Sequence, residues 1–170
     1  IPFSFDVYIS TNTPAKKALI EAVFRGWTRG RVEVRVAPNR GRDIAPKLIC
    51  FKDVYPNYEY VLHLHSKASK HAGVLATWRG YTYETLLGSP AIVASVFDAF
   101  RRRPDLGIVA AQHFEAMRHW INWGDDFKLA QPLAKRMGFA LSVDKVLDFP
   151  SGSMFWVRTA ALKPLLDLNL

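Results

Sequence analysis

Apolar and polar residues alternate near the start of the chain, over residues 5–9, and this period of two predicts a β-strand. A helix is predicted next, because Thr13 is a typical N-cap, Pro14 suits a first helical turn, and apolar residues then recur at helical spacing as far as Trp27. Valines at alternate positions of residues 32–36 predict a second strand. The chain therefore begins with a predicted strand, helix and strand.

The same two periodicities predict further elements along the chain. In order, these are a short helix over 44–51, a strand over 60–65, a helix over 90–102, a strand over 106–110, a helix over 127–137, a strand over 153–157 and a helix over 159–168. Strands that alternate with helices imply right-handed crossovers. The predicted fold class is therefore α/β, with a mostly parallel sheet and helices on both faces.

Length and composition bound the size and the setting of the protein. A chain of 170 residues, 49% of them hydrophobic, is long enough for one domain with its own core. The single cysteine, Cys50, cannot form an internal disulfide, and no apolar run reaches the roughly twenty residues of a membrane span. We therefore expect a cytoplasmic protein. A strand almost at the first residue and a helix almost at the last favour a piece that is truncated at both ends.

The formal net charge of +8 attracts polyanions, which include nucleic acids, anionic lipids and phosphorylated ligands. The basic residues are spread along the chain, and those in loops alternate with small and acidic residues. Nucleic-acid binding would require a basic cluster on one surface. We therefore expect no nucleic-acid partner.

Polar residues follow three of the predicted strands. They are Ser10 and Thr11 after the first, Asn39, Arg40, Gly41, Arg42 and Asp43 after the second, and His63, His65 and Lys67 at the end of the third. In an open parallel sheet the ligand crevice lies beyond the carboxyl ends of the strands. These three segments are therefore expected to converge on one ligand.

The loop over residues 39–43 suits a diphosphate. Arg40 and Arg42 supply two guanidiniums, Gly41 allows close approach of the backbone, and a helix N-terminus follows. The alternative is an ordinary basic turn in which Asp43 only caps the next helix.

His63 and His65 lie two residues apart on the predicted strand and therefore project from the same side. They either bind a divalent cation or form hydrogen bonds with a ligand. Two imidazoles without a carboxylate suit zinc or copper better than the magnesium or manganese of phosphate chemistry. Lys67 can neutralise a phosphate without a metal ion.

Two further segments carry candidate residues. A small turn and an apolar strand over residues 149–157 offer Ser151, Gly152, Met154 and Trp156 to an acceptor, while Phe155 is expected to be buried. Asp125 and Asp126 form an acidic pair that either acts as a base or only caps a helix.

Four segments, in this order, resemble the rhamnan synthesis protein F family. They are Phe5-Asp6-Val7-Tyr8-Ile9-Ser10-Thr11, Asn39-Arg40-Gly41-Arg42-Asp43-Ile44-Ala45-Pro46, Tyr60-Val61-Leu62-His63-Leu64-His65-Ser66-Lys67 and Phe149-Pro150-Ser151-Gly152-Ser153-Met154-Phe155-Trp156. The resemblance extends over nearly the whole chain. It implies a single glycosyltransferase-like domain over residues 1–170 with a GT-A-like, Rossmann-like nucleotide-sugar-binding core.

The resemblance also implies an activity. The expected reaction is an inverting transfer of a sugar, with L-rhamnose from dTDP-L-rhamnose as the example, to a glycan or lipid-linked glycan acceptor of bacterial cell-surface polysaccharide or lipopolysaccharide. Peripheral association with the inner face of the membrane is left open. The alternative is a noncatalytic carbohydrate-binding or scaffolding domain of a polysaccharide assembly complex.

The resemblance leaves the cofactor and the base open. His63 and His65 stand where a GT-A protein usually has a metal-binding Asp-x-Asp, so a Mg or Mn ion and metal independence are both consistent with the sequence. The catalytic base is expected outside the chain, with Asp125 and Asp126 as the candidates inside it.

Overall fold

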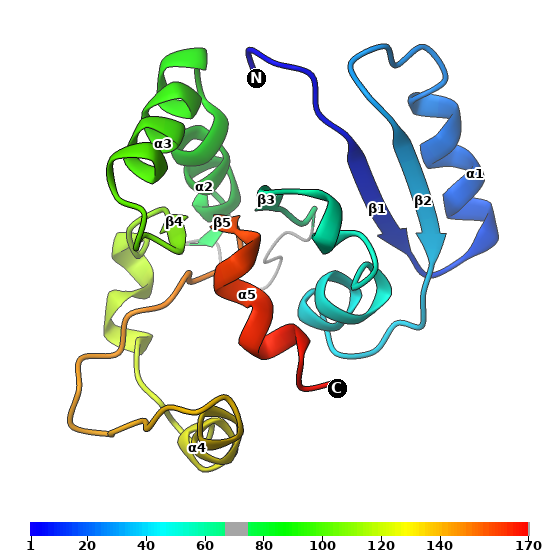
Figure 1. The fold of residues 1–170 in the computed structure, drawn as a ribbon. Coiled ribbons are helices and arrows are strands. Elements are labelled where there is room, and N and C mark those ends of the chain that lie inside the picture. Colours follow the sequence, from blue (N-terminus) through cyan, green and yellow to red (C-terminus); the bar gives the residue numbers. More distant parts are fainter. Residues whose placement is uncertain (67–74, 170) are drawn as a thin grey trace.

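The computed structural model describes residues 1–66 and 75–169 of the chain. Within these residues there are two separate sheets with helices around them (Figure 1). The strands in chain order are β1 (Val7–Thr11), β2 (Val32–Val36), β3 (Tyr60–His63), β4 (Ile108–Ala110) and β5 (Phe155–Arg158). No helix in the described part of the chain is both long enough and apolar enough to cross a membrane.

The first sheet consists of β1 and β2, which run parallel and pair from Val7↔Val32 to Thr11↔Val36. Helix α1 (Pro14–Val23) connects them. The Thr13 side chain accepts a hydrogen bond from the Lys16 amide at 3.2 Å, which confirms the predicted N-cap. The order strand, helix and strand was therefore predicted correctly, but β1 begins and ends two residues later than predicted and α1 ends at Val23 rather than Trp27.

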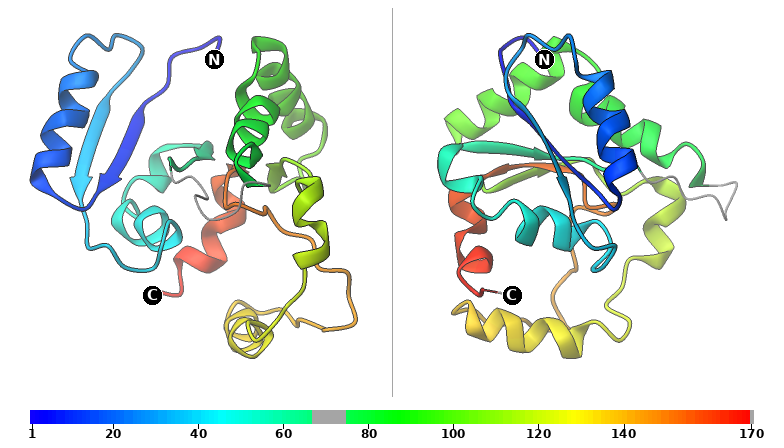
Figure 2. Two further views of the ribbon diagram at one scale, coloured as in Figure 1. Left: turned by 180° about the vertical axis from the view of Figure 1, so that it is seen from behind. Right: turned by 90° about the vertical axis from the view of Figure 1, so that its right-hand side faces the viewer.

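The second sheet has the order β3-β5-β4, and β5 runs antiparallel to both of its neighbours. Helices α2 (Trp78–Leu87) and α3 (Pro90–Arg102) pack on one face of this sheet, and α5 (Thr159–Leu166) packs on the other. Figure 2 shows the three strands lying between these helices.

The predicted mostly parallel, GT-A-like and Rossmann-like sheet is wrong. The described residues form a two-stranded parallel sheet and a three-stranded antiparallel sheet instead. The error lies in β5, because the long segment over residues 111–154 allows the chain to enter the sheet from either end. In the structure β5 pairs between β3 and β4 and runs antiparallel to both of them.

The core divides into two clusters, one on each face of the second sheet. The larger contains residues from α2, α3 and β5, and its buried members are Leu86, Val93, Val96, Phe100, Met154 and Trp156. The smaller contains Tyr55, Val157 and Leu162. The alternation of β5 therefore directs Trp156 to one face and Val157 to the other.

Contacts between aromatic rings and hydrogen bonds of tyrosine hydroxyls join the two sheets. A π-helix, η1 (Pro46–Cys50), and a 3-10 helix, η2 (Tyr55–Asn57), lie between β2 and β3 in the chain. Tyr8 of β1 stacks edge-on against Phe51 with 5.8 Å between ring centroids. The Tyr58 hydroxyl lies 2.9 Å from the Tyr8 hydroxyl and also donates to Asp6.

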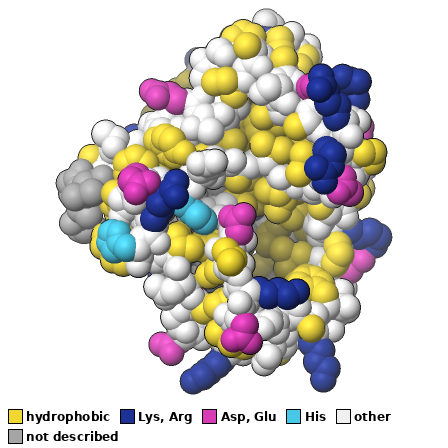
Figure 3. All heavy atoms as spheres, turned by 90° about the vertical axis from the view of Figure 1, so that its left-hand side faces the viewer, with side chains coloured by type: hydrophobic (Ala, Val, Ile, Leu, Met, Phe, Trp, Pro, Cys, Tyr) yellow, Lys and Arg dark blue, Asp and Glu magenta, His cyan; other side chains and the backbone are white. Residues whose placement is uncertain are grey.

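The segment between β4 and β5 contains a 3-10 helix, η4 (Glu115–Trp120), and helix α4 (Phe127–Arg136). In Figure 1, α4 lies at the bottom, away from both sheets. On the face shown in Figure 3, the molecule is hollowed and hydrophobic side chains line the hollow. Histidine side chains are visible on the same face.

Candidate functional site

The candidate residues that were predicted to follow the first two strands lie at one end of the first sheet, and Ser10 and Thr11 are the last two residues of β1. Ser10 pairs with Arg35 and Thr11 with Val36, and the Ala37 amide donates to the Thr11 carbonyl at 2.8 Å. Both strands run the same way, so their carboxyl ends are adjacent. Ser10 and Thr11 are therefore placed beside the start of the loop over residues 39–43.

This loop has an unusual backbone. Gly41 has φ 70° and Arg42 has φ 54°, so two successive residues are left-handed. A Cβ on Gly41 would lie 2.3 Å from the Ala45 Cβ, which requires glycine at that position. The side chains of Asn39, Arg40 and Arg42 are exposed, and neither guanidinium has a protein partner within residues 1–66 and 75–169.

Lys47 connects the loop to the turn before β5. Its ammonium donates to Asp43 Oδ2 at 3.2 Å and to the Ser153 carbonyl. Only 13% of the Lys47 side chain is exposed, and burial lowers its pKa although Asp43 offsets part of this effect. Burial raises the pKa of Asp43, but the hydrogen bond and charge of Lys47 outweigh it and hold the pKa below its usual range.

His65 also contacts the turn before β5. Its Nε2 lies 2.6 Å from the Gly152 carbonyl, so Nε2 carries the proton. The His65 carbonyl accepts from the Tyr83 hydroxyl at 2.7 Å. Gly152 has φ 82°, and a Cβ there would lie 3.1 Å from Trp78. His65 is thus fixed between α2 and the turn.

His63 is buried, with 5% of its surface exposed. Its Nε2 lies 2.8 Å from the Tyr55 hydroxyl, and its ring packs 4.7 Å from that of Phe155. Burial, together with the charge of Lys47, lowers the pKa of His63 to about 4. His63 is therefore a neutral core residue at physiological pH.

The two histidines were candidate metal ligands. Their Nε2 atoms bind different protein groups, and the carboxylate of Asp43 is paired with Lys47. Over the described ranges, no three His, Cys, Asp or Glu side chains are grouped to hold a metal ion. Magnesium and manganese prefer oxygen ligands. The described residues therefore contain no such group of ligands for either ion.

The predicted acceptor residues divide between the turn and the core. Met154 is 3% exposed and Trp156 is 4% exposed, and the Trp156 indole donates to the Leu86 carbonyl at 3.1 Å. Both side chains therefore belong to the core and present no free face to an acceptor. Ser151 is also buried, which leaves Gly152 as the predicted acceptor residue that borders His65.

Three candidates lie apart from this arrangement. Lys67 lies outside the described residues. Asp125 and Asp126 are exposed in the turn before α4, and neither carboxylate contacts another candidate residue in the part of the chain that the structure describes. Asp126 is the residue before α4, but its side chain makes no capping hydrogen bond.

Sequence reasoning missed several residues of the site. Lys47 follows Asp43 by four positions, a spacing that indicates an ion pair on a helix and was available in the sequence. Tyr55 contacts His63 across the turn between η2 and β3, and Tyr83 contacts His65 from α2, so no periodicity within one element identifies either contact. Helix α2, which carries Trp78 and Tyr83, was also missed because its apolar residues show weak periodicity.

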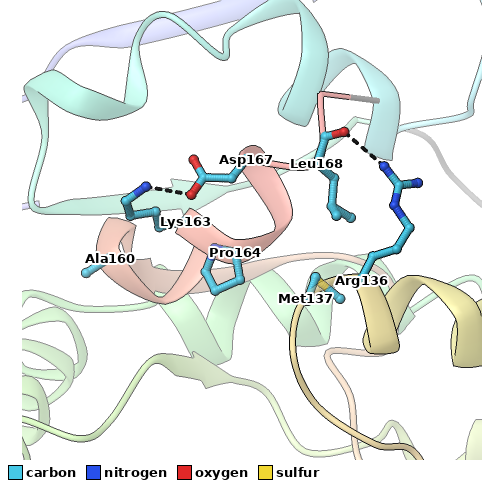
Figure 4. Close-up of a pocket in the computed structure, with 7 residues that line it drawn as sticks. All are labelled: Arg136, Met137, Ala160, Lys163, Pro164, Asp167 and Leu168. Atoms are coloured by element: carbon cyan, nitrogen blue, oxygen red, sulfur yellow. Dashed lines mark hydrogen bonds and ion pairs between the residues drawn. The ribbon is translucent and has the colours of Figure 1, made fainter.

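A groove of about 430 Å³ lies elsewhere, between the end of α4 and α5 (Figure 4). Its polar groups are already paired: Lys163 Nζ lies 2.5 Å from Asp167 Oδ2, and Arg136 donates to the Leu168 carbonyl at 3.2 Å. The groove contains none of the predicted residues. We therefore place the candidate site at the Lys47 cluster, defined here as Asp43, Lys47, His65, Gly152 and Ser153.

Comparison with known proteins identifies the family. Residues 1–170 match the family described as rhamnan synthesis protein F. The chain is also 37% identical over 142 residues to uncharacterized protein WxcX from two strains of Xanthomonas campestris pv. campestris. The aligned region is 82% of this chain and 20% of each relative, so it spans about a fifth of their length. No solved structure matches.

The chain therefore belongs to the rhamnan synthesis protein F family, as its motifs predict. The family takes its name from the synthesis of rhamnan, a polysaccharide.

Proposed function

We propose that this chain is a glycosyltransferase domain that transfers a sugar from a nucleotide sugar to a growing polysaccharide. The family supports polysaccharide synthesis as the setting. The observation that carries the proposal is the loop over residues 39–43, which presents two exposed guanidiniums and is anchored by the half-buried Lys47 cluster. Guanidiniums bind phosphate oxygens in pairs, which suits the diphosphate of such a donor.

The anchor gives the loop a defined position. The Lys47 ammonium forms an ion pair with Asp43, while the side chains of Arg40 and Arg42 extend from the same loop into solvent. The loop can therefore keep its shape when the two guanidiniums bind an anion. A candidate donor is dTDP-L-rhamnose, and the acceptor would approach from the side of Gly152.

Calorimetry with dTDP, UDP and GDP tests this proposal. We expect at least one nucleoside diphosphate to bind, and Arg42→Ala to weaken its affinity about tenfold or more, because a charge-assisted hydrogen bond contributes about 1.5–3 kcal/mol. The matched control is Arg25→Ala, which removes an equally exposed arginine before β2 rather than after it.

The titration also separates the alternatives. A noncatalytic carbohydrate-binding domain would bind glycan and none of the three nucleotides. The proposal fails if no nucleotide binds, with or without manganese. It also fails if Arg25→Ala weakens binding as much as Arg42→Ala, since the effect would then reflect overall charge.

A further inference from the structure

Helix α1 carries an apolar stripe on its solvent-exposed side. The stripe consists of Ala15, Ala18, Leu19, Ala22 and Val23, which recur at helical spacing and are all exposed. The two largest side chains are the most open to solvent, since Leu19 is 69% exposed and Val23 is 81% exposed. A surface helix normally packs its apolar face against the core. This face, called the α1 stripe here, therefore lacks the cover that its composition predicts.

The opposite side of α1 makes the contact with the protein. The helix packs on β1 and β2, and its half-buried apolar residues there are Ile20 and, just after its end, Phe24. The Trp27 ring lies edge-on to Phe24 and to Phe5, with 5.6 Å and 5.2 Å between ring centroids. Figures 1 and 2 show α1 on the outer side of the first sheet, away from the second sheet. The α1 stripe therefore points outward.

Basic side chains border the α1 stripe on both sides. Lys16 precedes Leu19 by three positions and Val23 by seven, so it lies along one side of the stripe. Arg25 follows Ala22 by three positions and lies along the other side. The Arg25 amide donates to the Ala22 carbonyl at 3.3 Å, so the chain continues the helical turn as far as this arginine. Both basic side chains are exposed.

The charge of this border is positive. The acidic residue of α1 is Glu21, and its carboxylate lies 3.6 Å from the ammonium of Lys17, which offsets it. The Lys16 ammonium donates to the neutral side chain of Asn12 at 2.8 Å. Arg25 forms no side-chain hydrogen bond or ion pair within residues 1–66 and 75–169. Two cations beside the α1 stripe therefore have no acidic partner among these residues.

This charge favours an anionic surface over a second copy of the chain. Each copy has a formal net charge of +8 and the same basic border, so two copies would repel each other. Three of the five residues of the α1 stripe are alanines, whose short side chains form no deep pocket for a partner protein. A fluid bilayer needs no pocket, because its headgroups attract lysine and arginine and its acyl boundary accepts apolar side chains.

We propose that α1 binds an anionic lipid bilayer through the α1 stripe. Leu19 and Val23 enter the boundary between headgroups and acyl chains, while Lys16 and Arg25 contact the headgroup phosphates. The ten residues of α1 are too few to span a bilayer, so the helix lies in the plane of the surface. This inference goes beyond the proposed function and does not depend on nucleotide binding.

The apolar part is tested by co-sedimentation with vesicles of equal parts phosphatidylglycerol and phosphatidylcholine. We expect the wild-type protein to bind, and Leu19→Gln with Val23→Gln to lower the affinity at least about tenfold, because the apolar contact is lost. Glutamine favours helices, which preserves α1. The matched control is Leu129→Gln with Val146→Gln, since these side chains are 70% and 94% exposed elsewhere in the chain, and it should leave the affinity unchanged.

The electrostatic part is tested with the same vesicles and with phosphatidylcholine alone. Lys16→Gln with Arg25→Gln should lower the affinity for the anionic vesicles about 25-fold, since each cation near such a surface contributes about fivefold. Added salt should weaken wild-type binding more than binding of this variant. Lys128→Gln with Lys145→Gln removes two exposed cations elsewhere and should have a much smaller effect.

Three results would overturn this proposal. The first is a wild-type protein that does not bind the anionic vesicles, and the second is an equal loss of affinity in either pair and its control. The third is a wild-type dimer in sedimentation velocity that Leu19→Gln with Val23→Gln makes monomeric, because a second copy would then cover the α1 stripe. Nucleotide calorimetry tests the proposed function separately, so each proposal can fail while the other stands.

Discussion

His63 shows how one buried side chain can make the stability of the protein depend on pH. The imidazole is buried against Tyr55 and Phe155 and lies near the charge of Lys47. Burial, together with that charge, lowers its pKa to about 4, compared with an ordinary 6.5. The unfolded chain therefore binds a proton at a higher pH than the folded protein does. The stabilising effect of the neutral form is complete above about pH 6.5 and is lost as pH falls towards about 4.

We predict that the free energy of unfolding falls by roughly 2 kcal/mol from this group between about pH 7 and about pH 5. Urea unfolding at the two pH values measures the change. Carboxylates also titrate in this range, so the comparison is with His63→Phe, which removes the imidazole and keeps an aromatic ring. An equal pH dependence in His63→Phe and the wild-type protein would contradict this account.

At the scale of elements, Lys47 connects η1 to the loop just before it and to the segment before β5, which is far from it in the chain. Its ammonium binds Asp43 before η1 and the Ser153 carbonyl before β5. Both partners are held near strained backbone, since Arg42 and Ser153 have φ 54°. Non-glycine residues in this conformation cost about 1 kcal/mol or more each, and the ammonium helps to hold them there.

We predict that Lys47→Met lowers the free energy of unfolding by about 1–3 kcal/mol, because Asp43 and the Ser153 carbonyl each lose a partner. In a double-mutant cycle, Asp43→Asn should cost less in the Lys47→Met background than alone. The control is Lys163→Met, which removes an exposed pair with Asp167 and should change stability by at most about 0.5 kcal/mol. Equal effects of the two lysine substitutions would refute the structural role of Lys47.

At the scale of the whole molecule, the two sheets share no strand pairing in the described residues and depend on side chains to stay together. Tyr58, just before β3, donates to Asp6, just before β1, and contacts the Tyr8 hydroxyl. The hydrogen bond from Tyr58 lowers the pKa of Asp6. The tyrosine therefore connects the sheet of the predicted donor loop to the sheet in which β3 ends at His63.

We predict that Tyr58→Phe lowers the free energy of unfolding by about 2 kcal/mol, since a hydrogen bond to a charged partner is lost. Chemical unfolding followed by circular dichroism provides the measurement. Tyr81→Phe, which removes an exposed hydrogen bond to the Gln112 carbonyl, is the control and should cost less than about 1 kcal/mol. A Tyr58→Phe protein as stable as the control would show that packing alone joins the sheets.

Patterns within a few residues were reliable in this protein because neighbours along the chain determine them. Thr13, the predicted cap, accepts a hydrogen bond from the amide three residues later, and Ser89 does the same at the start of α3. The alternation in β3 also places Val61 and His63 on one face and Leu62 on the other. The end of β3 was predicted two residues too late, since pairing with β5 stops at His63.

The sequence by itself determined the family motifs, most helices and strands, and the polar segments beyond β1, β2 and β3, because periodicity and turn chemistry are local. Tertiary structure alone decided the antiparallel direction of β5, the burial of Met154 and Trp156, and the contacts that Lys47 and His65 make with the turn before β5. Those outcomes depend on which distant segments pack together. The segment over residues 111–154 is long enough to permit either strand direction, so only pairing with β3 and β4 could fix it.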